Sequence, residues 1–350
     1  KSPSSTTPCF FNKSIAFRAD FNVKIGLGHI NRCLNLAEIL RRRGWSVIFI
    51  CRRSTEKQRI NFRRFKVFFI KKELSEENDG KITKNLIIRN SISVLLIDKD
   101  HFLNKKNKKQ YILFLKEIRK LNLVFAWEPF IFPNFSYDYI YHPYIGSDKL
   151  IKKKTKNIIH GEKYLVINEK FFSTRTIKKE VKNILINLGG ADNSEILSKI
   201  IKNFFIFKNK IKINIISFKK IEKKNLSRIK KIANDRNLKI NFTINPKKIY
   251  ELYKKADIGI VGSGYSKYEA SASGLPILIV QKKKSDFFFN KFFIKKKSSL
   301  LIKNINKDKD ILLKLINNFE VRKKMSKNGS NILNQKNSNK ISTIFENILK

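Results

Sequence analysis

The feature that most constrains this chain is the alternation, from residue 15 onward, of short apolar runs with longer amphipathic segments. Val94-Leu95-Leu96-Ile97 is one of the short runs. In the segment 30–43, apolar residues instead recur at three- and four-residue steps. This order is typical of strands that are joined by crossover helices. The sequence therefore predicts an α/β fold with parallel sheets.

The alternating pattern occurs twice along the 350 residues, a length typical of two domains. Expected strands in the first half cover residues 15–19, 46–51, 67–70, 93–98, 123–126 and 137–141. In the second half they cover residues 183–187, 212–217, 239–243, 258–261 and 276–280, with helices beginning near Ser194, Glu222, Lys247 and Tyr265. No solenoid repeat is visible, so we expect two similar domains that face each other.

The expected organisation has four parts. Residues 1–13 form a disordered leader that does not resemble a signal peptide, and residues 14–160 form a first domain that carries the catalytic loop. Residues 161–182 are the linker, and residues 183–350 form a second, nucleotide-binding domain whose last part, 307–350, holds two or three polar helices. The chain begins without Met, as a piece of a longer polypeptide would.

The charge of the chain is strongly positive, with 76 Lys and Arg against 28 Asp and Glu and a net charge of +48. A nucleic acid or an anionic membrane is the partner that such a charge first suggests. The lysines, however, are spread through the whole chain, and no reader motif accompanies them. We therefore expect a solvated basic surface and a small anionic substrate, without a specific nucleic-acid partner.

Further features narrow the class of protein. The longest apolar runs fall far short of the roughly 18 residues that cross a bilayer, so no membrane partner is expected. The 3 cysteines lack CxxC spacing and the 4 histidines lack ligand spacing, which argues against a disulfide framework, a metal site or another cofactor. These features predict a cytoplasmic protein.

The loop between the first expected strand and helix is the chemically informative segment. Gly26 and Gly28 allow a tight turn before the amide groups of a helix start. A dinucleotide fingerprint would need a third glycine where Asn31 stands, and the ending of a P-loop is absent. His29 follows the second glycine, where a helix N-terminus favours the neutral ring of a general base. A capping or packing role for His29 is the alternative.

Several motifs together resemble a known family. The series Arg18-x-Asp20, Ile25-Gly26-x-Gly28-His29 and Arg32-Cys33-Leu34 resembles the start of the UDP-2,4-diacetamido-2,4,6-trideoxy-β-L-altropyranose hydrolases of pseudaminic acid biosynthesis, which are related to spore-coat-polysaccharide proteins. The similarity continues, in the same order, through the segments 188–192, 262–269 and 274–276. The resemblance implies a GT-B-like architecture, in which two Rossmann-type domains face each other across a cleft, and a UDP-sugar substrate.

The resemblance also implies roles for individual residues. His29 would activate water against the anomeric carbon, without a metal, and UDP would leave. The implied substrate-binding residues are Arg18, Asp20, Gly26, Gly28, Arg32 and Asp98. The implied UDP-binding residues are Gly189, Gly190, Asp192, Gly262, Ser263, Gly264, Ser266 and Glu269. In this group the loops would present donors to the diphosphate, and Glu269 would accept the ribose hydroxyls. A simple turn at Gly189 and a solvent-facing acid at Glu269 are the alternatives.

The chain departs from the family pattern at Trp127-Glu128, at Lys283-Lys284-Ser285-Asp286 and beside Asp98. Two other functions therefore stay open. A GT-B glycosyltransferase would release UDP only when an acceptor is present. A non-catalytic nucleic-acid-binding protein would bind strands with an affinity that falls steeply with salt. Fusion to, or association with, another sugar-nucleotide enzyme is a further expectation.

Overall fold

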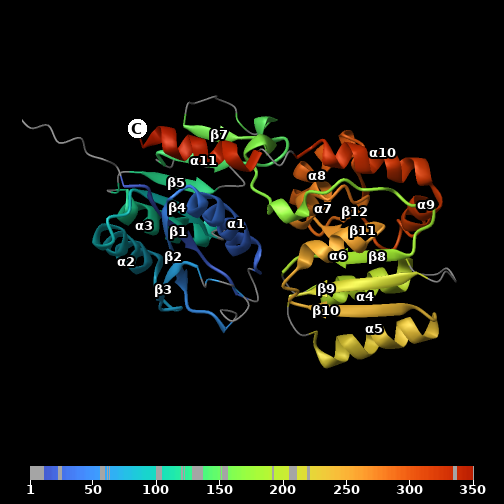
Figure 1. The fold of residues 1–350 in the computed structure, drawn as a ribbon. Helices are drawn as coiled ribbons and strands as arrows, with labels where there is room; N and C mark the ends of the chain where they lie inside the picture. Colours follow the sequence, from blue (N-terminus) through green and yellow to red (C-terminus); the bar gives the residue numbers. More distant parts are fainter. Residues whose placement is uncertain are drawn as a thin grey trace, which may run out of the picture.

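The computed structural model describes residues 12–22, 26–55, 60, 62, 64–99, 105–119, 121, 123–127, 137–149, 151, 157–190, 193–204, 211–218, 221–333 and 337–349. Figure 1 shows two α/β units side by side, each with a sheet between layers of helices. The expected leader lies almost entirely outside the described residues, as does Asp192.

The first unit contains a sheet of 7 strands in the order β3-β2-β1-β4-β5-β6-β7, and all of its neighbours pair in parallel. The strands are β1 (Ser14–Ala19), β2 (Ser46–Arg52), β3 (Lys66–Ile70), β4 (Val94–Asp98), β5 (Val124–Trp127), β6 (Tyr139–His142) and β7 (Ile158–His160). The order reverses between β1 and β4, and such a switch point is where open parallel sheets hold ligands. The sequence analysis did not predict β7, because three residues are too few to show a period.

Helices cover both faces of this sheet. Helix α1 (Gly28–Arg42) lies on one face, and α2 (Glu76–Arg89) and α3 (Lys105–Ile118) pack together on the other. Because side chains alternate along a strand, Leu96 belongs to the core under α1, whereas Leu95 and Ile97 belong to the core under α2 and α3. This alternation decides the site described below.

The second unit contains a sheet of 6 parallel strands in the order β10-β9-β8-β11-β12-β13. The strands are β8 (Asn183–Asn187), β9 (Lys212–Ser217), β10 (Lys239–Ile244), β11 (Ile258–Gly262), β12 (Ile277–Val280) and β13 (Ser299–Ile302). The helices are α4 (Ser194–Phe204), α5 (Lys223–Asp235), α6 (Ile249–Lys255), α7 (Ser266–Ala272), α8 (Phe287–Lys295), α9 (Ile311–Asn317) and α10 (Phe319–Ser330). Strand β13 was not predicted, because it is a short run between lysine-rich and polar stretches.

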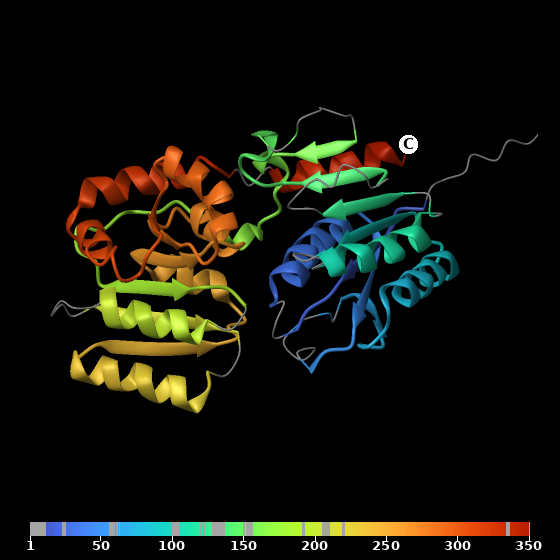
Figure 2. The ribbon, with the colours of Figure 1, turned by 180° about the vertical axis from the view of Figure 1, so that it is seen from behind.

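The last helix, α11 (Asn337–Ile348), packs against the first unit, although the sequence analysis grouped it with the second. The ring of Phe345 lies 4.7 Å from that of Phe125 and 6.0 Å from that of Trp45. Figure 2 shows this helix, in red, alongside the green strands of the first unit. The apolar side of α11 thus covers sheet surface that sequence order does not connect to it. None of the helices in the described part of the chain is both long and apolar enough to cross a membrane.

Candidate active-site cleft

A cleft of about 1140 Å³ lies between the two units, at the carboxyl ends of their parallel strands. The loop after β1 and the start of α1 form one wall, and the loops after β8 and β11 form the other. The walls approach closely at one point, because a Cβ on Gly190 would lie 2.7 Å from the backbone nitrogen of Leu27. The sequence-predicted residues that line the cleft are Gly26, Gly28, His29, Arg32, Gly189, Gly190, Ser263, Gly264, Ser266 and Glu269.

The first wall carries a histidine that is paired with a carboxylate. His29 and Arg32 lie about one turn apart on α1, and Asp98 is the last residue of β4. The distance from His29 Nδ1 to Asp98 Oδ1 is 2.6 Å. Asp98 is buried, whereas the His29 side chain is 22% exposed. The pair therefore has one closed side and one side that opens to the cleft.

The neighbours of His29 determine its tautomer. Arg32 NH2 lies 3.1 Å from His29 Nδ1, but the carboxylate of Asp98 is nearer, and an ionised carboxylate only accepts hydrogen bonds. An unprotonated Nδ1 would place its lone pair 2.6 Å from the Asp98 carboxylate. The proton therefore sits on Nδ1 and is donated to Asp98, which leaves Nε2 as the basic atom of the ring. No hydrogen bond to Nε2 is made by the part of the chain that the structure describes.

Asp98 is held as an anion by its partners. Burial alone would raise its pKa, but the Arg32 guanidinium and His29 lower the pKa well below the usual value. Arg32 Nε donates to Asp98 Oδ2 at 2.6 Å, NH2 donates to Oδ1, and the Cys33 thiol lies 3.4 Å from Oδ2. Asp98, which the sequence analysis named as a substrate-binding residue, instead contacts His29 and Arg32 and does not line the cleft.

Arg32 is itself enclosed by aromatic side chains. Its guanidinium lies 4.6 Å from the centroid of the Trp127 ring, and NH1 donates to the hydroxyl of Tyr144. Trp127 stands at one of the positions where the chain departs from the family pattern, and its ring supports this cation. The sequence analysis did not single out Tyr144, because no local motif marks it.

Arg18 and Asp20 do not meet the cleft, which corrects their expected substrate-binding role. Arg18 is 0% exposed, and its guanidinium donates to Asp79 at 2.9 Å and to Asp20 at 2.6 Å. The physical reason is strand alternation, because Arg18 points to the same face as Ala16, under α2 and α3. Its motif position is correct, but its side chain lies on the face of the sheet away from α1.

The second wall places a carboxyl group beside the loop after β8. Gly189 has a φ of +93°, which favours glycine, and its N–H donates to Asn187 Oδ1 at 3.1 Å. The amide of Asn187 donates to the Tyr253 hydroxyl at 2.7 Å, and that hydroxyl lies 3.4 Å from Glu269 Oε2. Burial raises the pKa of Glu269 to about 7. Loop and carboxylate therefore form one connected surface.

The hydroxyls of the loop after β11 are engaged inside the protein. Ser263 donates to the Val280 carbonyl at 3.0 Å, and Ser266 donates to the Gly262 carbonyl at 3.4 Å. Gly262 does not line the cleft, and a Cβ there would lie 2.7 Å from the Leu188 carbonyl oxygen. These hydroxyls can accept hydrogen bonds from a ligand. To donate to a diphosphate, as expected, each would first have to break its hydrogen bond to the backbone carbonyl.

A cation that the sequence analysis left unassigned stands beside this wall. Lys282 Nζ donates to the Leu188 carbonyl at 2.6 Å and to the side chain of Asn193. Shielding from water lowers the pKa of Lys282 to about 8. Phe218, Asn245 and Lys247 also line the cleft and come from the ends of β9 and β10. No sequence motif marks these residues; only their positions just after strands could have indicated them.

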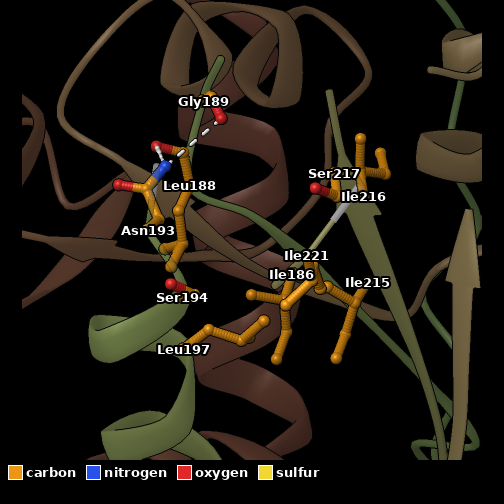
Figure 3. Close-up of a pocket in the computed structure, with 10 residues that line it drawn as sticks. All are labelled: Ile186, Leu188, Gly189, Asn193, Ser194, Leu197, Ile215, Ile216, Ser217 and Ile221. Carbon is orange, nitrogen blue, oxygen red and sulfur yellow. Dashed lines mark hydrogen bonds between the residues drawn. The ribbon is translucent and has the colours of Figure 1, made fainter. Parts of the chain in front are cut away.

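A small cavity of about 30 Å³ lies behind the same loop (Figure 3). Ile186, Leu197 and Ile215 line it, and Asn193 Nδ2 donates to the carbonyls of Leu188 and Gly189 at 3.2 and 3.3 Å. This volume holds one or two waters at most. The cavity is therefore a small packing gap behind the loop after β8, too small for a substrate. The cleft is the candidate site.

No family model matches the chain. The chain is 29% identical over 285 residues to a Methanocaldococcus jannaschii protein, "Uncharacterized protein MJ1062", an alignment that covers 76% of this chain and 55% of that protein. It is 29% identical over 140 residues to the spore coat polysaccharide biosynthesis protein SpsG of Bacillus subtilis, which covers 36% of this chain and 38% of SpsG. The chain thus spans about half, or less, of the curated relatives that it matches.

Solved structures match the whole two-unit arrangement. A glycosyltransferase from Rickettsia africae superposes with a TM-score of 0.62 at 12% identity, covering 96% of this chain and 99% of that one. The S. aureus MnaA structure with UDP superposes with a TM-score of 0.65 at 10% identity, covering 96% of each chain. At these identities the similarity concerns the fold alone. The chain has a GT-B-like fold, with two Rossmann-type domains that face each other across a cleft.

Proposed function

We propose that the chain is a nucleotide-sugar enzyme that hydrolyses a UDP-sugar to UDP and free sugar, with UDP on the second unit and the sugar facing His29. The observation that carries the proposal is the His29–Asp98 pair, because its open side faces the same cleft as Gly189, Gly190 and Glu269. A histidine held by a carboxylate opposite glycine-rich loops supports the proposal, because this arrangement can activate water beside a bound diphosphate.

The relatives support the chemical class of the substrate. SpsG is named for spore coat polysaccharide biosynthesis, and the MnaA structure contains UDP. The motifs from Arg18 to Arg32 resemble those of hydrolases that act on UDP-2,4-diacetamido-2,4,6-trideoxy-β-L-altropyranose. We therefore propose this sugar nucleotide as the substrate to test first, within the synthesis of pseudaminic acid or a related surface polysaccharide.

The proposed reaction is a single displacement. His29 Nε2 accepts a proton from water while the water oxygen forms a bond to the anomeric carbon, and the bond between that carbon and the diphosphate oxygen breaks. Asp98 stabilises the imidazolium that forms, and Arg32 holds Asp98 in place. Loop amides beside Gly189, together with Lys282, lie where they would stabilise the negative charge on the departing UDP.

A glycosyltransferase is the second candidate, and the size of the cleft favours it. The volume of about 1140 Å³ exceeds the roughly 300–1,000 Å³ of a site for one small ligand, so an acceptor would fit beside the UDP-sugar. In this reaction, His29 would take the proton of an acceptor hydroxyl instead of that of water. The fold serves both reactions equally well.

The experiment measures UDP release from this sugar nucleotide without an acceptor and with EDTA present. We expect release by the natural sequence and a loss of roughly 10²–10⁴-fold in His29→Asn, the usual range for a missing general base. UDP binding by His29→Asn, measured by calorimetry, is the control for folding. Equal turnover in both proteins would remove His29 from the mechanism. UDP binding without release would favour a transferase or another sugar.

A further inference from the structure

The contact between Arg32 and Tyr144 has no part in the displacement described above. Tyr144 follows β6 and precedes a short 3-10 helix (Ser147–Lys149). Its hydroxyl accepts from Arg32 NH1, while Arg32 Nε and NH2 donate to Asp98. A continuous set of hydrogen bonds therefore runs from His29 through Asp98 and Arg32 to Tyr144.

The ring of Tyr144 packs against the second unit. Its centroid lies 5.5 Å from that of Phe289 in α8 and 6.3 Å from that of Tyr268 in α7. The adjacent backbone is also held against α8, because a Cβ on Gly146 would lie 2.1 Å from the Phe292 ring. The position of Tyr144 is thus set by the second unit, even though its hydroxyl serves the first.

The same two helices carry or support residues of the second wall of the cleft. Tyr268 directly precedes Glu269 in α7, and Asn290 of α8 donates to the Ser263 hydroxyl at 2.9 Å. A change in how the second unit sits on the first would move these side chains and the Tyr144 ring together. Packed side chains transmit such a change because they do not deform continuously.

We propose that Tyr144 is a positioning residue that makes the orientation of the His29–Asp98 pair depend on the seating of the second unit. The inference rests on the proposed function and adds to it. The ring of Tyr144 contacts α7 and α8, so it moves with them. Its hydroxyl fixes the plane of the Arg32 guanidinium, and that guanidinium donates to both oxygens of Asp98. Without this hydroxyl, Arg32 and Asp98 can rotate together, and the His29 ring follows.

The test is Tyr144→Phe, which keeps the ring and removes the hydroxyl. We expect kcat for UDP release to fall roughly 10–100-fold with KM within about threefold, because misplacing a catalytic group acts on the chemical step. Tyr141→Phe is the matched control. Tyr141 is also buried in this region, makes an edge-to-face contact with Trp127 at 4.6 Å, and donates to the Tyr164 carbonyl and not to Asp98 or Arg32. It should lower thermal stability without changing kcat.

A double-mutant cycle separates positioning from a structural role. If Tyr144 acts through Arg32, Tyr144→Phe lowers kcat in the natural sequence but has no further effect in an Arg32→Met background. An equal loss in both backgrounds would overturn the proposal, as would a raised KM with unchanged kcat, because either result would mean that Tyr144 acts independently of Arg32.

A spectroscopic measurement makes the test independent of turnover. The Nδ1 proton of His29 is held by Asp98, so it gives an exchange-protected imidazole resonance, which is assigned by its absence in His29→Asn. We expect this resonance to be lost to exchange in Tyr144→Phe and retained in Tyr141→Phe. Retention in both variants would refute the coupling. If the natural sequence releases no UDP, the proposed function fails while this result still decides the role of Tyr144.

Discussion

Two buried Arg–Asp clusters lie on opposite faces of the first sheet, and only one of them opens to the cleft. Asp98 and Lys99 are neighbours in sequence, yet Asp98 binds Arg32 on the α1 face, whereas Lys99 binds Asp79 at 2.9 Å on the α2 face. Opposite charges at adjacent positions thus lie on opposite faces of the sheet, each with a partner of its own.

The cluster under α2 does not reach the cleft. The cations Arg18, Arg52 and Lys99 contact the carboxylates of Asp20, Asp79 and Glu76. Burial alone would raise the pKa of Asp79, but Arg18 and Lys99 lower it well below the usual value. This set fixes the chain between β1, β2 and α2, and none of its members lines the cleft.

The cluster under α1 differs by one side chain. Arg32 and Asp98 are as tightly paired as Arg18 and Asp79, but the third member, His29, lines the cleft. A buried ion pair becomes a candidate catalytic group when it holds an exposed base in one tautomer. Position at the cleft, and not the presence of charge, therefore distinguishes the two clusters.

Breaking the cluster under α2 should have the largest effect on stability. Asp79→Asn removes the carboxylate that Arg18, Arg52 and Lys99 share and leaves the buried Arg18 with Asp20 as its counter-charge. The free energy of unfolding should therefore fall by about 3–5 kcal/mol, with kcat of the folded protein unchanged. The folded pKa of Asp79 is lowered, so its contribution is present above its ordinary value and is lost as pH falls through the folded value. Urea unfolding at pH 7 and pH 3 should therefore show the gap between variant and natural sequence narrowing in acid.

Breaking the open cluster by the same chemical change should act on turnover. Asp98→Asn no longer stabilises an imidazolium at His29, so we expect kcat to fall roughly 10²–10³-fold. Its loss of unfolding free energy should be smaller than that of Asp79→Asn, because the open side lets water reach the unpaired groups. Steady-state UDP release and urea unfolding of both variants give the comparison. A larger rate loss in Asp79→Asn would reverse the assignment of the two clusters.

A carboxylate of the second unit sharpens the comparison. No ion pair to Glu269 is found among the residues that the structure describes, and burial raises its pKa to about 7. If Glu269 accepts ribose hydroxyls, its ionised form binds better, so the affinity for UDP should improve as pH rises from 6 to 8. Glu269→Gln should bind UDP roughly tenfold more weakly than the natural sequence at pH 8. Its affinity should not show the rise from pH 6 to pH 8 that ionisation of Glu269 causes. Calorimetry of both proteins isolates the effect, because the ionisation of UDP itself cancels in their ratio.

The last prediction concerns a lysine of the second unit and its effect on the pH dependence of stability alone. Lys267 is 1% exposed, donates to Asn290 Oδ1 at 2.9 Å and lies among aromatic rings; burial lowers its pKa to about 7. The folded protein therefore binds fewer protons than the unfolded chain above pH 7, so stability rises with pH up to the ordinary lysine value.

Lys267→Met should remove that rise. We expect the melting temperature of the variant, relative to the natural sequence, to be most favourable at and below pH 7 and to lose on the order of 5 °C of this advantage toward pH 10. The exposed Lys296→Met should show a constant difference across the same range. A constant difference for Lys267→Met as well would mean that this lysine keeps an ordinary pKa.

Much of the fold could be predicted from local pattern. The strands β8 (Asn183–Asn187) and β9 (Lys212–Ser217) have the predicted bounds, because short apolar runs between polar segments identify buried parallel strands. Strands β7 and β13 were missed because they are too short for a period. Helix α11 was assigned to the wrong unit, because an apolar helix face does not specify which of two sheets it covers.

The candidate site likewise has a part that the sequence predicted and a part that it did not. Sequence determined that His29 follows two glycines at the start of a helix and that glycine-rich loops follow β8 and β11. The order of these motifs resembles that of a family of nucleotide-sugar enzymes. Only the tertiary structure decided that Asp98 and Arg32 hold His29, that Arg18 and Asp20 point to the opposite face, and that Tyr144 joins the two units. The physical reason is that a motif shows which residues are neighbours along the chain. Which side chains meet in space depends on strand alternation and on the packing of one unit against the other.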